Sequence, residues 1–219
     1  MTTPWVVGPD PDQTISYGDA VDQVIEFYGD SGPLVTLIHG GYWKPSNNRE
    51  HMRALAAKLS ESGFRVANIE YRRDPGNPQK LFDDVDNALA KLTKSIAIIG
   101  FSVGGQIALV SKSNVHKLIL LAPVTDLLRT KSEDLGENAV RNFFGEVELS
   151  KFDPMARTYN QHIYILHGDK DERVPLQHSR DFAKEKGASL MEISGADHFA
   201  LLDPQSVAFD LILHTLLSK

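Results

Sequence analysis

The chain of 219 residues contains no cysteine, which excludes disulfide bonds, thiolate metal sites and a cysteine nucleophile. No apolar run approaches the roughly 18 residues that a transmembrane helix needs, and the first residues lack the basic and apolar regions of a signal peptide. Positive charge is also scarce, since 29 acidic residues outnumber 23 lysines and arginines. A net charge of −6 argues against nucleic acid or an anionic membrane as a partner. These absences predict a cytoplasmic protein.

The rest of the composition is typical of a globular protein, with 42% hydrophobic and 24% charged residues. We find no internal repeat, low-complexity tract or long linker, so one domain over 1–219 is the simplest prediction. Apolar strand-like runs alternate with helical patterns of about 10–15 residues, which predicts an α/β fold with a mostly parallel, doubly wound sheet and helices on both faces. Residues 124–158 break this alternation and are predicted to form a small lid or cap.

The individual elements follow from hydrophobic periodicity and turn residues. Residues 14–28 alternate as a hairpin does, and residues 47–62 are predicted to form a helix that Asn47 or Asn48 could cap. The expected strands are 14–17, 23–28, 34–38, 64–71, 96–99, 116–123, 162–166 and 189–193. The expected helices are 47–62, 79–92, one starting near 104, 176–185 and 204–217, with short helical pieces around 137–144.

Ser102 stands at the centre of a Gly-x-Ser-x-Gly pattern between a buried strand and a helix. This arrangement is typical of a nucleophile elbow, in which a strained turn lifts the serine hydroxyl clear of the sheet. The pentapeptide alone is a moderate signal, and the alternative is a surface serine in an ordinary loop. The strand before it and the helix after it favour the elbow.

A serine nucleophile needs a general base and an acid that orients the base. His198 is the candidate base, because it follows the last predicted strand and precedes the closing helix. Asp169 and Asp171 compete for the role of the acid; we favour Asp171, since Asp169 could instead bend its turn through a side-chain hydrogen bond. His51, His178 and His214 lie in helical patterns and are expected to be packing or surface residues.

A second glycine motif, residues 39–43, leaves the strand at 34–38. Glycines there allow backbone N–H groups to face a pocket, so the predicted oxyanion-hole donors are the N–H groups of Val103 and Gly41, with Tyr42 as a third. Tyr42 and Trp43 could line the substrate pocket, or pack the loop against the cap; both interpretations stay open.

The motifs around Ser102, at 39–41 and at 167–175 together resemble those of α/β-hydrolases of the esterase and lipase group, over nearly the whole chain. In that group the acid falls at the position of Asp171. The segment His39-Gly40-Gly41-Tyr42-Trp43 is similar to the His-Gly-Gly-x-Trp signature of kynurenine formamidases. This narrower resemblance implies hydrolysis of N-formyl-kynurenine to kynurenine and formate.

The expected activity is therefore hydrolysis of an ester or amide of a small substrate, with aromatic substrates included, through an acyl-enzyme on Ser102. No cofactor is expected, and no metal, because His39, His167 and Asp169 lack a recognisable ligand spacing. The expected partner is a small-molecule substrate, with a homodimer left open. The alternative from another class is an inactive binding protein on the same fold.

Overall fold

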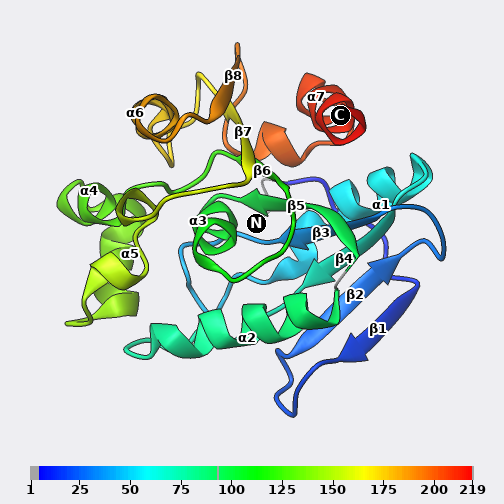
Figure 1. Ribbon diagram of the computed structural model, residues 1–219, viewed down its shortest axis with the longest axis horizontal. Helices are drawn as coiled ribbons and strands as arrows, with labels where there is room; N and C mark the ends of the chain where they lie inside the picture. Colours follow the sequence, from blue (N-terminus) through cyan, green and yellow to red (C-terminus); the bar gives the residue numbers. More distant parts are fainter. Residues whose placement is uncertain (1–4, 93, 219) are drawn as a thin grey trace.

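The computed structural model describes residues 5–92 and 94–218, and a single twisted sheet runs through it (Figure 1). The order of its eight strands is β1-β2-β4-β3-β5-β6-β7-β8. The pairs β1–β2 and β2–β4 are antiparallel, whereas every pair from β4–β3 to β7–β8 is parallel. The predicted α/β architecture is confirmed, and the predicted hairpin forms its antiparallel edge.

The strands lie close to their predicted positions. Their central members are almost wholly buried, as expected for continuous apolar runs covered on both faces. The bounds are β1 Gln13–Ser16, β2 Val24–Tyr28, β3 Leu34–Ile38, β4 Arg65–Ile69, β5 Ser95–Phe101, β6 Lys117–Leu121, β7 His162–Gly168 and β8 Ser189–Ile193.

Helices cover both faces of the sheet, as predicted (Figure 1). One face carries α1 and α7, and the other carries α2, α3 and α6, so the apolar side chains divide into two clusters, one on each side. The bounds are α1 Arg53–Glu61, α2 Pro78–Lys91, α3 Val103–Val110, α6 Leu176–Lys186 and α7 Val207–Leu217. None of the helices within the described ranges is long and apolar enough to cross a membrane.

The segment predicted as one helix over 47–62 is divided. A 3₁₀ turn, η1 (Arg49–Met52), precedes α1, and the Asn48 side chain caps it by accepting the Glu50 N–H. The predicted helix is present, and its first turn is a 3₁₀ turn. The backbone hydrogen bonds of η1 join residues three apart, whereas those of α1 join residues four apart. Such 3₁₀ turns are common at the N-termini of α-helices.

Residues 124–158, which were predicted to be a cap and are called the cap below, contain α4 (Leu127–Ser132), α5 (Leu135–Phe144) and the short turns η2 (Leu149–Lys151) and η3 (Pro154–Ala156). The start of α5 is irregular, since Asp134, Gly136, Glu137 and Asn138 all have positive φ. The apolar side chains of α5 join the core cluster that covers α2 and α3. The cap therefore shares a buried apolar cluster with the helices on that face of the sheet.

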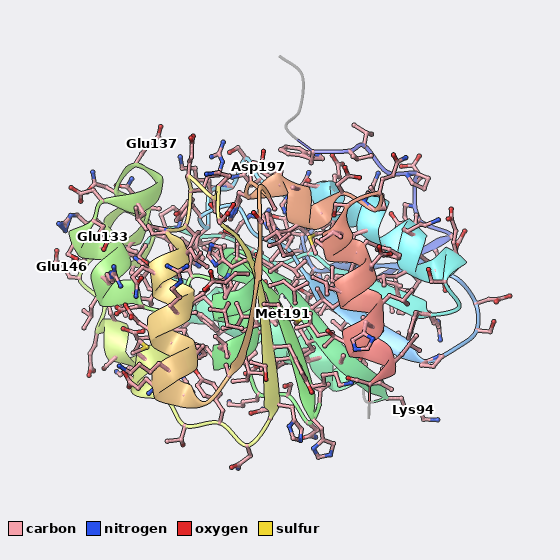
Figure 2. All side chains as sticks on the ribbon, turned by 90° about the horizontal axis from the view of Figure 1, so that it is seen from above. Lys94, Glu133, Glu137, Glu146, Met191 and Asp197 are labelled. Atoms are coloured by element: carbon pink, nitrogen blue, oxygen red, sulfur yellow. The ribbon has the colours of Figure 1, made fainter. Side chains whose placement is uncertain are left out.

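The carboxyl ends of the parallel strands meet at one edge of the molecule. Figure 2 shows Glu137 of the cap and Asp197, next to His198, at this edge, while Lys94 before β5 lies at the opposite end. Ligands of open parallel sheets bind outside the carboxyl ends of the strands. This edge is therefore where a functional site is expected.

Candidate active site

Ser102 occupies the tight turn between β5 and α3. Its backbone is left-handed, with φ of 55° and ψ of −121°. A non-glycine residue rarely adopts positive φ, and it persists only where the surroundings hold it. Here the Ser102 N–H donates to the Leu121 carbonyl at 2.8 Å, and the Ser102 carbonyl accepts the Gly105 N–H at 2.9 Å. The neighbouring strand and the helix start together hold the strained serine.

The helix behind this turn approaches the sheet very closely. A Cβ atom on Gly104 would lie 2.1 Å from the Ile38 carbonyl oxygen, so only glycine fits there. Val103 is the first residue of α3, and first-turn N–H groups have no acceptor within their own helix. The elbow therefore presents a hydroxyl beside a helix N-terminus, which favours negative charge.

His198 and Asp171 lie in the loops after β8 and β7, and their side chains meet. His198 Nδ1 is 2.6 Å from Asp171 Oδ2, while Asp171 Oδ1 accepts the N–H groups of Arg173 and Val174. Asp169 instead accepts the Gly195 N–H at 2.7 Å and binds the turn before His198. The structure thus brings Asp171, and not Asp169, to the imidazole.

Asp171 is ionised despite its burial. Burial opposes the charged form, yet hydrogen bonds from His167 and His198 hold the pKa of Asp171 well below its ordinary value. His167 Nε2 is 3.4 Å from the same carboxylate oxygen that His198 contacts. Since an ionised carboxylate only accepts hydrogen bonds, Nδ1 of His198 is the ring nitrogen that donates a hydrogen bond to Asp171.

The glycine loop after β3 has a run of left-handed residues, with φ of 115° at Gly41, 49° at Tyr42 and 55° at Trp43. The loop lies against the elbow, because a Cβ atom on Gly40 would be 2.8 Å from Ser102 Cβ. Within the described part of the chain, the N–H groups of Gly41 and Tyr42 make no hydrogen bond. Two backbone donors are therefore available close to Ser102.

A cavity of about 460 Å³ joins these features at the carboxyl edge of the sheet. Ser102 and His198 both line it, as do Gly41 and Tyr42 of the glycine loop. The start of α5 forms the wall on the cap side. The remaining aromatic rings of its lining belong to Trp5, His51, Phe101 and Phe199. The Phe101 ring lies 4.7 Å from that of His198, so the residue before the serine packs directly on the imidazole.

The model of the BD-FAE family matches residues 26–162, which is more than half of the chain. This chain belongs to the BD-FAE family. The match contains the glycine loop, Ser102 and the whole cap, and it ends before Asp171 and His198.

Solved structures similar to this BD-FAE member are esterases. Esterase B from Lactobacillus rhamnosis, inhibited by a tributyrin phosphonate, is 15% identical with a TM-score of 0.78, covering 95% of this chain and 87% of that one. Thermogutta terrifontis esterase 2, phosphonylated by sarin, is 18% identical with a TM-score of 0.74, covering 94% and 93%. A truncated carbohydrate esterase from gut microbiota is 17% identical with a TM-score of 0.75, covering 97% and 100%. At these identities the likeness shows the α/β-hydrolase fold; no curated protein sequence matches the chain.

Trp43 of this BD-FAE member is not on the cavity wall. Its ring, 1% exposed, stacks on Phe143 at 5.8 Å and meets the edge of Phe144 at 5.1 Å. Its Nε1 donates to Gln106 Oε1 at 3.3 Å. These contacts match the interpretation in which Trp43 packs the loop against the cap, whereas substrate contact by Trp43 stays a prediction. Tyr42 does line the cavity, and its hydroxyl donates to the Arg173 carbonyl at 2.6 Å.

His51 was missed as a site residue. It is 5% exposed, it lines the cavity, and its Nε2 accepts the Gly40 N–H at 3.3 Å. Burial lowers the pKa of His51 to about 3, so the ring is neutral. No sequence signal identifies His51 as a site residue. It lies in the 3₁₀ turn η1, within the segment whose periodicity predicted an ordinary helix.

Residues that could hold a metal ion do not gather in this BD-FAE member: over 5–92 and 94–218, no group of three or more histidine, aspartate and glutamate side chains is arranged as a ligand set. His39 instead contacts Glu70 at 2.9 Å, and His167 contacts the Val174 carbonyl at 2.9 Å. His39 is therefore bonded to the residue after β4, and His167 to the loop that follows β7.

Proposed function

We propose that the chain is a serine hydrolase that cleaves a carboxylic ester or amide of a small substrate. The observation that carries this proposal is the hydrogen bond between His198 and Asp171, together with a strained Ser102 that lines the same cavity as His198. An imidazole oriented by a buried carboxylate is what a serine hydroxyl needs in order to act as a nucleophile at neutral pH.

In the proposed reaction, Ser102 Oγ attacks the substrate carbonyl carbon, and His198 Nε2 takes the hydroxyl proton. Asp171 keeps the proton on Nδ1 and stabilises the imidazolium that forms. His198 then protonates the leaving alcohol or amine, and the carbon–oxygen or carbon–nitrogen bond of the substrate breaks. Water, deprotonated by His198, releases the acid from the acyl-enzyme and regenerates Ser102.

The carbonyl oxygen becomes an oxyanion in each step. The proposed donors are the N–H groups of Val103, Gly41 and Tyr42. Support comes from the helix N-terminus at Val103 and from the unbonded N–H groups of the glycine loop. Loss of one such donor typically lowers kcat by about 10²–10³.

The cavity favours a small substrate with an aromatic group. Its volume of about 460 Å³ is at the lower end of ligand pockets, and aromatic rings, including those of Trp5 and Phe199, form part of its wall. Aromatic rings pair favourably in tilted and offset arrangements. Esters of small aromatic acids or of phenols are accordingly the first substrates to examine.

Hydrolysis of N-formyl-kynurenine is the second candidate function. The motif at 39–43 favours it, although Trp43 packs on the cap and away from the cavity. A further observation in its favour is Arg173, whose guanidinium on the cavity wall is 5.2 Å from the Phe199 ring. An aryl amide that carries a carboxylate matches such a pair of groups.

A fluorophosphonate probe tests the proposal against an inactive binding protein. The probe phosphonylates an activated serine, so the wild-type chain is expected to become labelled and Ser102→Ala is not. Intact mass identifies the adduct, and tandem mass spectrometry of the peptide locates it. An unlabelled wild-type chain that is folded by circular dichroism would contradict the proposed function.

Comparing p-nitrophenyl acetate with N-formyl-kynurenine separates the two enzymatic candidates. For each substrate kcat/KM is measured with wild-type enzyme and with Ser102→Ala. Turnover of the ester with no release of formate from the formamide would remove the second candidate. If kcat/KM for the formamide is well above that for the ester, hydrolysis of N-formyl-kynurenine becomes the favoured function.

A further inference from the structure

The glycine loop carries more backbone strain than its glycines account for. Tyr42 and Trp43 have side chains, yet both have positive φ. A non-glycine residue in this region is strained, so contacts elsewhere must hold it. The direction of the Tyr42 N–H depends on those contacts.

Two donors hold the Gly41 carbonyl. The Asn47 amide, Nδ2, donates to the Gly41 oxygen at 2.8 Å, and the Lys44 N–H donates to the same oxygen at 3.0 Å. The peptide between Gly41 and Tyr42 is trans, so its C=O and N–H point in opposite directions. Whatever holds the Gly41 oxygen therefore also aims the Tyr42 N–H.

The side chain of Asn47 is well suited to this task. It is half-buried on the cavity wall, and its Cβ lies so close to Gly41 that a Cβ atom there would be 2.3 Å away. The Tyr42 ring is held at its far end by the hydroxyl bond to the Arg173 carbonyl. Asn47 and Arg173 thus fix the two sides of Tyr42 while its N–H remains unbonded within the described ranges.

We propose that Asn47 is a positioning residue of the oxyanion hole, which holds the Gly41–Tyr42 peptide so that the Tyr42 N–H faces the developing oxyanion. This inference rests on the proposed function. Asn47 donates to the Gly41 oxygen and acts through the peptide it holds. Its effect belongs to the transition state, because the oxyanion exists only there.

Asn47→Asp tests the inference, because it preserves the shape but replaces a donor with a carboxylate that repels the Gly41 oxygen. The matched control is Asn48→Asp, one residue along, since aspartate caps the η1 turn as asparagine does. The expected result for Asn47→Asp is a decrease in kcat of about 10- to 100-fold with KM within about twofold. Asn48→Asp is expected to keep both constants. The substrate is p-nitrophenyl acetate.

A second variant and a second measurement keep the test decisive. Asn47→Ala leaves only the Lys44 N–H on the Gly41 oxygen, so its kcat should lie between those of wild type and Asn47→Asp. Inactivation by a fluorophosphonate forms a tetrahedral adduct with an oxygen in the oxyanion hole, and its rate should fall in the same order. Thermal unfolding reports folding separately; if Asn47→Asp is unfolded, Asn47→Ala carries the test.

The possible failures are distinguishable. Unchanged kcat in a folded Asn47 variant, or equal loss in Asn47→Asp and Asn48→Asp, would overturn the positioning role while wild-type labelling leaves the proposed function standing. A rise in KM at constant kcat would also overturn it, because that pattern indicates uniform binding. A wild-type chain that neither turns over ester nor accepts the probe would overturn the proposed function, and this inference with it.

Discussion

Asp169 and Asp171 are two residues apart in one loop, yet they bond to different groups. Asp171 contacts His198 Nδ1, whereas Asp169 accepts the Gly195 N–H. We expect Asp171→Asn to lower kcat for p-nitrophenyl acetate by about 10³–10⁴, because an amide in place of the carboxylate no longer fixes the tautomer. Asp169→Asn should stay within about tenfold, since an amide oxygen can still accept the Gly195 N–H. Loss of turnover in Asp169→Asn alone would reverse the assignment of the acid.

His51 should make stability depend on pH. Burial lowers its pKa from 6.5 to about 3 in the folded chain, so below pH 6.5 the unfolded chain binds the additional proton. Stability from this residue is complete above pH 6.5 and is lost as the pH falls toward 3. From pH 6.5 to 5 the expected loss is about 2 kcal/mol in the free energy of unfolding. Urea unfolding at the two pH values measures it, with His51→Gln expected to flatten the change and an equally steep change in that variant contradicting the prediction.

The sequence identifies site residues that follow strand ends, and misses those that packing brings in. Ser102, Asp171 and His198 were predicted from their order along the chain and from the strands before them. His51 carries no such signal, because only tertiary packing places its ring next to Gly40 and Phe101. Trp43 had two equal interpretations, because an aromatic residue in a loop can line a binding pocket or pack into the core.

Among the secondary-structure elements, the cap and α3 are connected through Trp43 and Gln106. The Trp43 indole donates to Gln106 Oε1, and Gln106 Nε2 donates to the Phe152 carbonyl at 2.7 Å. We expect Trp43→Phe to lower the free energy of unfolding by about 2 kcal/mol through lost packing and an unsatisfied Gln106 oxygen. Its KM for aromatic esters should stay within about twofold, because the ring is not on the cavity wall. Thermal unfolding measures the change in stability, and steady-state kinetics measures KM. A large increase in KM at unchanged stability would indicate that Trp43 contacts the substrate.

The regular elements were predictable from the sequence, and the departures have local causes. Ile96 belongs to an apolar run, yet it is 42% exposed. The register of β5 against β3 passes from Ser95 to Ala97 and leaves Ile96 unpaired, as in a β-bulge, and an irregularity of pairing cannot be read from periodicity. Likewise the left-handed start of α5 has no signature beyond Gly136, so the cap was predicted by its break in the alternation and not by its shape.

Across the whole molecule, the cap and the sheet share one apolar core. Phe144 and Phe152 of the cap lie in the same buried cluster as Leu81 of α2 and Ile107 of α3. The Phe82 ring of α2 stacks on Phe152 at 4.9 Å. Removing the cap would therefore expose the apolar faces of α2 and α3, which costs about 25 cal/mol for each Å² of apolar surface.

A cap that shares its core with the sheet should not unfold by itself. We expect one thermal transition in which far-ultraviolet circular dichroism, which follows the sheet and helices, and near-ultraviolet circular dichroism, which follows the packed aromatic residues, have the same midpoint. Limited proteolysis below that midpoint should spare residues 124–158, because the aromatic side chains of the cap are held in the common core. An earlier near-ultraviolet transition together with cleavage confined to 124–158 would instead make the cap a separate unit, and the wall that α5 gives the cavity would then be free to open while the sheet stays folded.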